Sequence, residues 1–259
     1  MQTCFSNPIQ ILSYNIQGLP TLFLSAKKQK TKKIINESIN YQIILYQENW
    51  MSQKEVFTEI LNNHNIYVSS KSKYPHMLQR AFNPNGAGLT MGITKEYEIL
   101  YYEEILFKGC SGYFNKLNDC LASKGFQKMT IFLPQIGEID IYNTHLDAGD
   151  SPEDKSIRKT QINQMKTYIY DTGMSNPIVI AGDFNMTLSD GDSTLYYFYQ
   201  DLDLLGKSIK TPQPMLDYIF IKNSPRIILR ILEYQINHSF NGLSDHPAVS
   251  AKISAELVK

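Results

Sequence analysis

Residues 177–185 read PIVIAGDFN, and this segment indicates how the chain folds and where its polar chemistry lies. The apolar run over 177–182 is typical of a buried strand, and it stops at the carboxylate of Asp183. Gly182 has no side chain, so it lets the backbone approach closely. Residues two apart in an extended chain project to the same side, so Asp183 and Asn185 are expected to point together. An acid and an amide side by side can hold a water molecule and a phosphoryl oxygen.

Other apolar runs also stop at, or start from, a polar side chain, at Asn15, Glu48, His145, Asp217, Asp245 and His246. A single aspartate at a strand end usually caps a turn, and a single histidine is usually structural. So many such positions in one chain favour a common site instead. Carboxylates that gather repel one another and require a cation, and an oxygen-rich donor set selects magnesium, manganese or calcium over zinc. Two histidines beside them can transfer protons near neutral pH.

The rest of the pattern predicts many strands with helices between them. Strands are predicted over 9–16, 42–47, 86–94, 99–107, 126–133, 139–144, 177–182, 216–221, 227–233 and 248–253. Helices are predicted over 27–41, 52–63, 152–170 and 194–205. In the first helix Ile34, Ile35 and Ile39 share one side, and Ser52 is the predicted N-cap of the second. Consecutive strands with helices interspersed favour an α/β sandwich with mixed sheets over a doubly wound parallel sheet, and the polar stretch 71–85 is predicted to be a loop.

Length and charge limit the possible functions. The chain has 259 residues, of which 42% are hydrophobic, which suits one large domain over residues 1–259. The formal net charge is +0, so the bulk positive charge needed for tight nonspecific nucleic-acid binding is absent, although a local basic groove stays open. No apolar run approaches the roughly 20 residues that span a bilayer. Met1 leads into a polar stretch rather than a signal peptide; because a leader can be removed, the compartment stays open, and we expect a soluble monomer.

The three cysteines, Cys4, Cys110 and Cys120, have no spacing typical of a zinc site. Cys110 and Cys120 could pair if the protein is exported. We favour the interpretation that Cys110 and Cys120 are free thiols.

Six short motifs carry a resemblance to a known family. They are Leu12-Ser13-Tyr14-Asn15, Gln47-Glu48, Thr144-His145-Leu146-Asp147-Ala148-Gly149, Gly182-Asp183-Phe184-Asn185, Leu216-Asp217-Tyr218 and Ser244-Asp245-His246-Pro247. In this order the chain resembles the endonuclease/exonuclease/phosphatase superfamily, which has the DNase I-like fold. The resemblance implies a four-layer αββα sandwich, in which two mixed β-sheets pack face to face with helices outside, and a site at one rim of the sheets.

The resemblance also implies a role for each residue in a magnesium-dependent in-line attack of water on phosphorus. For the metal, it implies Glu48 as the principal ligand, helped by Asn15, with Asp245 supporting the metal or an imidazole. For the reaction, it implies Asp183 orienting or deprotonating the water, Asn185 bound to the scissile phosphate, and His246 as base or phosphate-stabilising acid paired with Asp217. His145 is implied to hold a phosphate oxygen or to protonate the leaving group. Mn²⁺ and Ca²⁺ fit the same oxygen donors.

The form of the motifs favours one branch of the superfamily. Thr144-His145-Leu146 disfavours abasic-site endonucleases, and Met215-Leu216-Asp217-Tyr218 disfavours inositol-polyphosphate 5-phosphatases. The Thr-His-Leu-x-Ala-Gly form looks more like neutral sphingomyelinases and related bacterial phosphodiesterases, as does Ala122-Ser123-Lys124-Gly125-Phe126. Lys124 is a candidate substrate-binding residue, although we favour the alternative of a solvated turn lysine.

A phosphodiesterase acting on a phospholipid headgroup, with sphingomyelin as the best single candidate, is therefore the leading expectation. A nuclease is the alternative, with Lys71, Lys73, Arg80, Lys124 and Arg158 as candidate groove cations. An inositol-phosphate phosphatase is a further alternative, and a scaffold without activity is disfavoured because the expected polar residues are all present. Aromatic residues crowd the middle of the chain, at Tyr97, Tyr101, Tyr102, Phe107, Tyr113 and Phe114. Either part of this region forms an exposed hairpin or loop that contacts lipid, or the rings pack inside the sandwich, which is the interpretation that we favour.

Overall fold

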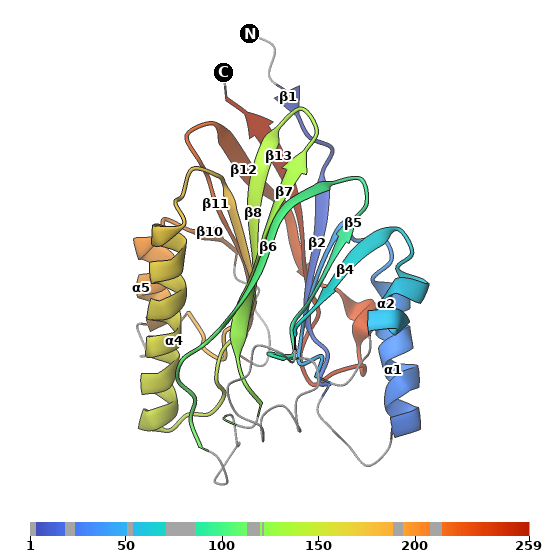
Figure 1. Ribbon diagram of the computed structural model, residues 1–259, viewed down its shortest axis with the longest axis vertical. Coiled ribbons are helices and arrows are strands. Elements are labelled where there is room, and N and C mark those ends of the chain that lie inside the picture. Colours follow the sequence, from blue (N-terminus) through green and yellow to red (C-terminus); the bar gives the residue numbers. More distant parts are fainter. Residues whose placement is uncertain are drawn as a thin grey trace.

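Two β-sheets pack face to face at the centre of the molecule, and helices cover the outer face of each (Figure 1). The structure is a computed structural model that describes residues 4–18, 24–50, 54–70, 86–112, 120, 122–188, 194–207 and 214–258. The two sheets are mixed, and the four layers run helix, sheet, sheet, helix. The predicted αββα sandwich is therefore confirmed.

Within the described residues, the first sheet has seven strands. They are β1 (Cys4–Phe5), β2 (Ile9–Asn15), β3 (Ile43–Gln47), β4 (His64–Val68), β5 (Thr90–Thr94), β12 (Ile227–Ile236) and β13 (Val249–Leu257). Helices α1 (Leu24–Glu37) and α2 (Lys54–Ile60) lie on its outer face, where Leu12 and Tyr14 pack against Ile34 and Phe57. A short 3₁₀ turn, η2 (His238–Phe240), adds Phe240 to this outer cluster.

The second sheet has six strands within the described residues. They are β6 (Glu98–Leu106), β7 (Gly125–Leu133), β8 (Gly137–His145), β9 (Ile178–Asp183), β10 (Leu205–Gly206) and β11 (Asp217–Lys222). Helices α4 (Pro152–Asp171) and α5 (Thr194–Asp201) cover its outer face. Ser151 caps α4 in a capping box with Asp154, which satisfies two free N–H groups at the start of this helix.

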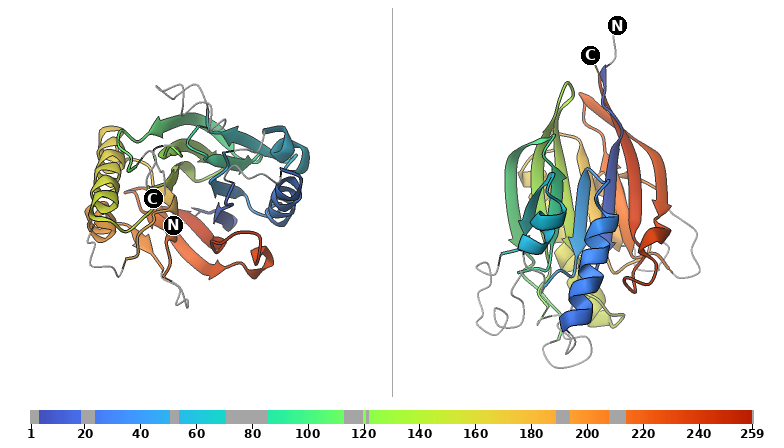
Figure 2. Two further views of the ribbon diagram at one scale, coloured as in Figure 1. Left: turned by 90° about the horizontal axis from the view of Figure 1, so that it is seen from below. Right: turned by 90° about the vertical axis from the view of Figure 1, so that its right-hand side faces the viewer.

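Each sheet contains one parallel pair, β2 with β3 and β8 with β9, and these pairs bring distant polar residues to one edge. Asn15 is the register partner of Gln47, and His145 is the partner of Asp183. The sheets are joined near this edge by a hydrogen bond from Gln47 Nε2 to Asn143 Oδ1 (2.8 Å). The carboxyl ends of all four strands thus meet at one end of the sandwich, whereas β1 and the end of β13 lie at the opposite end (Figures 1 and 2).

Most predicted elements exist, with shifted ends. Helix α1 ends at Glu37, so Ile39 does not join the buried side but lies in the following turn with 47% of its surface exposed. The strand predicted from 86 starts only at Thr90, because Gly86 and Gly88 take left-handed backbone conformations (φ 55° and 68°) that interrupt an extended chain. Helix α5 ends at Asp201 rather than at 205, and the short strands β1, β4 and β10 were not predicted.

Cys110 and Cys120 form a disulfide, with an S–S distance of 2.05 Å, so the expectation of two free thiols is wrong. Among the aromatic residues of this region, Tyr97, Tyr102 and Phe107 pack against the core, as the interior interpretation predicts, whereas Tyr101 is 46% exposed. Tyr113 and Phe114 lie outside the described residues, as do Ser52 and the stretch 71–85.

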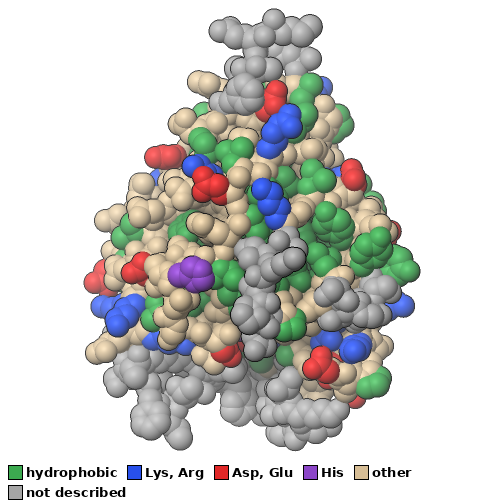
Figure 3. Space-filling model, turned by 180° about the vertical axis from the view of Figure 1, so that it is seen from behind, with side chains coloured by type: hydrophobic (Ala, Val, Ile, Leu, Met, Phe, Trp, Pro, Cys, Tyr) green, Lys and Arg blue, Asp and Glu red, His purple; other side chains and the backbone are tan. Residues whose placement is uncertain are grey.

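Charges of both signs are interspersed over the described part of the face seen in Figure 3, in keeping with the net charge of +0. Among the described residues, no helix combines the length and apolar character that a membrane crossing needs.

Candidate active site

The carboxylate of Asp183, at the end of β9, is the centre of a cluster of polar side chains from both sheets. Asn15 on β2 donates from Nδ2 to Asp183 Oδ2 (2.9 Å), and the backbone N–H of Asn185 donates to Oδ1 (2.9 Å). The ring nitrogens Nε2 of His145 and His246 lie 3.5 Å and 3.7 Å from Oδ2. Asp183 is buried, so each of these contacts acts in a medium of low polarity, where it is strong.

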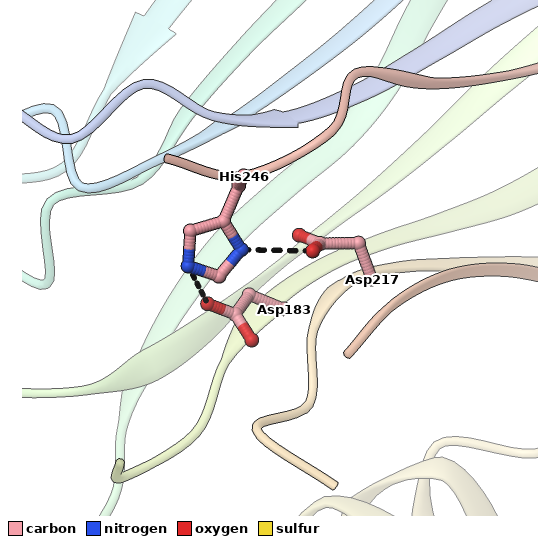
Figure 4. Close-up of side chains that lie close together, drawn as sticks. All are labelled: Asp183, Asp217 and His246. Carbon is pink, nitrogen blue, oxygen red and sulfur yellow. Dashed lines mark hydrogen bonds and ion pairs between the residues drawn. The ribbon is translucent and has the colours of Figure 1, made fainter. Parts of the chain in front are cut away.

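His246 lies between two carboxylates (Figure 4). Its Nδ1 is 2.8 Å from Oδ2 of Asp217, and its Nε2 faces Asp183. Burial lowers the pKa of His246, but the hydrogen bond and charge of Asp217, together with the charge of Asp183, outweigh burial and raise the pKa to about 10. The imidazole is therefore a cation at neutral pH in this arrangement.

The two carboxylates are themselves perturbed. Burial and the charge of Asp217 raise the pKa of Asp183 to about 6, against the opposing effects of His246 and Asn15. Burial also raises the pKa of Asp217, whose Oδ1 is buried without a hydrogen-bond partner among the described residues. Asp217 starts β11 and is the register partner of Asp183, so antiparallel pairing alone sets the two acids side by side. Two acids held this close favour a cation between or beside them.

Glu48 follows β3 and has a left-handed backbone conformation (φ 57°), as Asn185 does after β9 (φ 50°). Non-glycine residues seldom adopt this conformation, and it recurs at functional sites, where the surrounding structure holds it. Burial raises the pKa of Glu48, while the charge of Lys124 and a hydrogen bond from Asn15 lower it. Oε1 of Glu48 lies 3.9 Å from Nε2 of His145, so the acid faces the same centre as Asp183.

His145 and Lys124 are in direct contact in the interior. Lys124 Nζ lies 3.0 Å from His145 Nε2, and only 4% of the lysine is exposed. The expectation that Lys124 is a solvated turn lysine is therefore wrong, because the start of β7 places it beside the end of β8. Burial, followed by the charges of Lys124 and His246, holds the pKa of His145 well below its usual value. His145 is thus neutral at neutral pH.

Trp50, two residues after Glu48, completes this side of the cluster and was missed by sequence reasoning. Its ring lies 6.0 Å from the ring of His145 and 5.2 Å from Lys124 Nζ, a cation–π contact. The available signal was that Trp50 is the only tryptophan of the chain and closely follows a motif.

A surface cavity opens beside His246 and Asn185. Asn185 donates from Nδ2 to the carbonyl of Leu146 (2.8 Å), which fixes its amide at the cavity wall. Asp245 lies at the exposed mouth, where Ser244 Oγ donates to its Oδ1 (3.2 Å). Its charge contributes to the raised pKa of His246, so the structure places Asp245 near the imidazole rather than in the buried centre.

The donor set suits a hard divalent cation. The carboxylates of Glu48 and Asp183 both have raised pKa values and share hydrogen bonds from Asn15, so a cation beside them would relieve their repulsion. Asn15 uses its NH₂ group to hold these acids in place, and its Oδ1 accepts the N–H of Gln17 (3.0 Å), which leaves one lone pair of this oxygen for a cation. Ligand atoms of Asp183, Asp217 and His246 lie within 4.8 Å of one another, but there the imidazolium already supplies the positive charge.

Comparisons with known proteins agree with this architecture. The sequence pattern of the endonuclease/exonuclease/phosphatase family matches residues 12–246. Sphingomyelinases of Mycobacterium bovis and Mycobacterium tuberculosis are 24% identical over 94% of this chain and 52% of theirs, so the chain spans about half the length of these relatives.

Solved structures show the same fold. Sphingomyelinase C from Streptomyces griseocarneus has a TM-score of 0.70 at 17% identity, covering 95% of this chain and 99% of that one. The catalytic domain of human nocturnin with bound sulfate has a TM-score of 0.70 at 19% identity, covering 98% and 97%.

Proposed function

The chain belongs to the endonuclease/exonuclease/phosphatase family, and from this premise we propose that it is a magnesium-dependent phosphodiesterase whose substrate is a phospholipid headgroup ester, with sphingomyelin as the leading candidate. One observation carries the proposal: a buried Asp183 is surrounded by an amide, a neutral histidine and a cationic histidine, which come from three other segments of the chain. Such a site can activate water on one side and stabilise a phosphoryl group on the other.

Asp183 is assigned to the attacking water. Its pKa of about 6 lies close to neutral pH, where a general base combines sufficient ionisation with sufficient basicity. Asn15 and the N–H of Asn185 fix both of its oxygens, so a water that binds the carboxylate is held in one orientation. The water oxygen then attacks phosphorus in line with the ester oxygen that leaves, and the proton of the water passes to Asp183. As the new P–O bond forms, the P–O bond to the leaving alcohol breaks, and the departing oxygen takes a proton from solvent water.

His246 is assigned to the developing negative charge on the phosphoryl oxygens. Of the two roles expected for it, base or phosphate-stabilising acid, its raised pKa supports the acid, because a cation at neutral pH has no lone pair free to accept a proton. Asp217 keeps the ring protonated and oriented through the 2.8 Å contact. Asn185 adds the second N–H of its amide to the same phosphate.

His145 and Lys124 are assigned to a phosphate oxygen on the other side. Because the pKa of His145 lies well below its usual value, the ring is neutral and is a poor proton donor to a leaving group. This supports the alternative in which His145 holds a phosphate oxygen, with the ammonium of Lys124 beside it as a substrate-binding charge.

A divalent cation would be held by Glu48, next to Asp183 and Asn15, and would neutralise charge on the phosphoryl oxygens. Mg²⁺ is the expected ion, and Mn²⁺ or Ca²⁺ would accept the same oxygen donors. Asp245, at the exposed mouth, is assigned to supporting the imidazole of His246.

The lipid-headgroup proposal is supported by the similarity to sphingomyelinases along nearly all of this chain. The nuclease alternative loses one of its candidate cations, because Arg158 is only 2% exposed and donates to the carbonyls of Asp147 and Gly149. Lys71, Lys73 and Arg80 lie outside the described residues. Of the five cations proposed for a nucleic-acid groove, Lys124 is therefore the one within the described residues that remains a candidate.

A substrate panel tests the proposal. Sphingomyelin, phosphatidylcholine, plasmid DNA, inositol phosphates and an aryl phosphodiester are incubated with the protein in Mg²⁺ or in EDTA. We expect Mg²⁺-dependent release of phosphocholine from sphingomyelin at the highest rate. Hydrolysis that persists in EDTA would contradict the metal dependence, and preferential cleavage of DNA would replace the lipid substrate with nucleic acid.

A further inference from the structure

A buried polar cluster lies behind the site and joins the disulfide loop to the strand that ends at His145. Asp147, two residues after His145, is fully buried. Its Oδ2 accepts the backbone N–H of Ser111 (2.7 Å), and its Oδ1 accepts Nε2 of Gln161 on α4 (2.8 Å). The N–H of Asp147 in turn donates to Oε1 of Gln161 (3.0 Å). One carboxylate therefore ties a loop, a helix and the segment after β8 together.

Helix α4 holds the same segment at a second place. Arg158 donates from one guanidinium nitrogen to the carbonyls of Asp147 (3.1 Å) and Gly149 (2.6 Å). Charged and amide side chains on the covered face of a helix are unfavourable unless their hydrogen bonds are made, and apolar residues would fill the space at less cost. The contacts made by Arg158 and Gln161 are the kind that set a backbone position rather than merely fill a core.

The disulfide links this arrangement back to His145, so that the contacts form a closed path that begins and ends at His145. Ser111, which binds Asp147, directly follows Cys110, and Cys110 is joined to Cys120. Lys124 lies four residues beyond Cys120 and contacts His145, while its carbonyl accepts the N–H of Phe107 (3.1 Å). From His145 the path thus runs through Asp147 and the disulfide to Lys124 and back to His145.

We propose that Asp147 is a positioning residue of the site, which acts with the Cys110–Cys120 disulfide to keep His145 and Lys124 in contact. The inference rests on the proposed phosphodiester hydrolysis for its kinetic consequence. Its structural consequence is independent of that function, because Trp50, the only tryptophan, lies against both His145 and Lys124 and reports on their placement.

The test compares Asp147→Ala, Asp147→Asn and the double variant Cys110→Ala/Cys120→Ala with wild type, by steady-state kinetics on the best substrate of the panel and by Trp50 fluorescence. We expect Asp147→Ala to lower kcat about 100-fold, as a misplacement of about 1 Å does, with KM changed less than about threefold. Asn keeps one acceptor oxygen and should lose less activity than Ala. The double cysteine variant should lower kcat in the same way, and all three should shift the emission of Trp50.

Asp140→Asn is the matched control. Asp140 is a buried acid on β8, the strand that precedes Asp147. It is bonded to Thr130 (2.6 Å) and paired with Lys128 (3.2 Å), but it has no part in the connection between Asp147, the disulfide and Lys124. Its variant should lower the unfolding temperature while leaving kcat and the Trp50 emission as in wild type.

Wild-type emission in both Asp147→Asn and the double cysteine variant would overturn the inference, even if Asp147→Ala fails to fold. If the wild-type protein hydrolyses no phosphodiester, the proposed function fails, whereas the emission of Trp50 still decides whether Asp147 positions the site.

Discussion

At the scale of single residues, the protonation states at the site follow from which groups are buried together. His246 has two acids as neighbours and is held as a cation, whereas burial, followed by the charge of Lys124, keeps the pKa of His145 low and the ring neutral. Asp183, between the two rings, has a pKa raised to about 6. The surroundings of these three side chains thus give each a different protonation behaviour near neutral pH.

Removing one acid or one imidazole at this centre should abolish most of the turnover. We expect Glu48→Gln, Asp183→Asn and His246→Ala each to lower kcat at least about 100-fold, because each removes a charge or a proton acceptor from the proposed transition state. Far-UV circular dichroism should be unchanged. Asp201→Asn and His238→Ala, at exposed positions, are the controls and should keep full activity. Near-normal turnover in any of the three would remove that residue from the mechanism.

The pH dependence of kcat/KM should show two limbs. On the acid side, activity should rise as Asp183 ionises, with an apparent pKa of about 6 that a bound metal ion would lower. On the alkaline side, activity should fall as His246 loses its proton near pH 10. Asp217→Asn removes the charge that supports protonated His246, so the pKa of His246 falls and the alkaline limb moves to lower pH. An alkaline limb that stays in place in this variant would show that His246 is not the group that titrates there.

At the scale of elements, the site depends on the close parallel pairing of β8 and β9. Gly182 is the partner of Thr144, and its backbone (φ 150°) passes so near that strand that an added Cβ would overlap the carbonyl oxygen of Thr144. The close approach predicted for this glycine is therefore confirmed. This close contact between β8 and β9 also fixes the position of Asp183, the next residue along the chain.

Gly182→Ala should therefore lower the free energy of unfolding by about 3 kcal/mol or more and remove activity, because β9 must move away from β8. Gly173→Ala is the matched control: this glycine also has a positive φ (84°), but an added Cβ would meet no atom within 4 Å. It should lose only about 1 kcal/mol, from backbone strain alone. Chemical denaturation curves for the two variants measure the difference, and equal losses would contradict the packing argument.

At the scale of the whole molecule, the sandwich brings several carboxylates together at one end. Because these negative charges repel one another, a cation that binds there should stabilise the fold. We expect Mg²⁺ to raise the unfolding temperature by binding only the folded protein, with a stabilisation of about 2.7 kcal/mol at a free concentration of 100 times Kd. The effect should be larger at pH 7 than at pH 5, because below its pKa of about 6 Asp183 must lose a proton before it can face a cation. Differential scanning fluorimetry gives both values.

Glu48→Gln is the variant that makes this measurement specific, since it removes the proposed principal ligand. It should reduce the Mg²⁺-induced shift. A shift as large as in wild type would place the cation elsewhere on the molecule.

The sequence by itself determined an α/β sandwich with mixed sheets and the set of polar residues to consider, because the apolar runs and the polar residues at their ends are local properties of the chain. The four-layer αββα order was implied by the resemblance of the six motifs to a known family. The sequence also predicted the Asp183–Asn185 segment and the need for a close approach at Gly182. The short strands β4 and β10 carried too little periodicity to be recognised, and the ends of α1 and α5 depended on packing.

Only the tertiary structure decided how the site works. Asn15 and Asp183 are 168 residues apart, yet share a 2.9 Å hydrogen bond, and the burial of Lys124 beside His145 follows from the pairing of β7 with β8. Charge state depends on burial and on neighbours in space, and neither is visible in a local pattern. For the same reason the place of Trp50 against His145 became apparent only when the two sheets were brought face to face. The pairing of Cys110 with Cys120 became apparent only in the folded connection between β6 and β7.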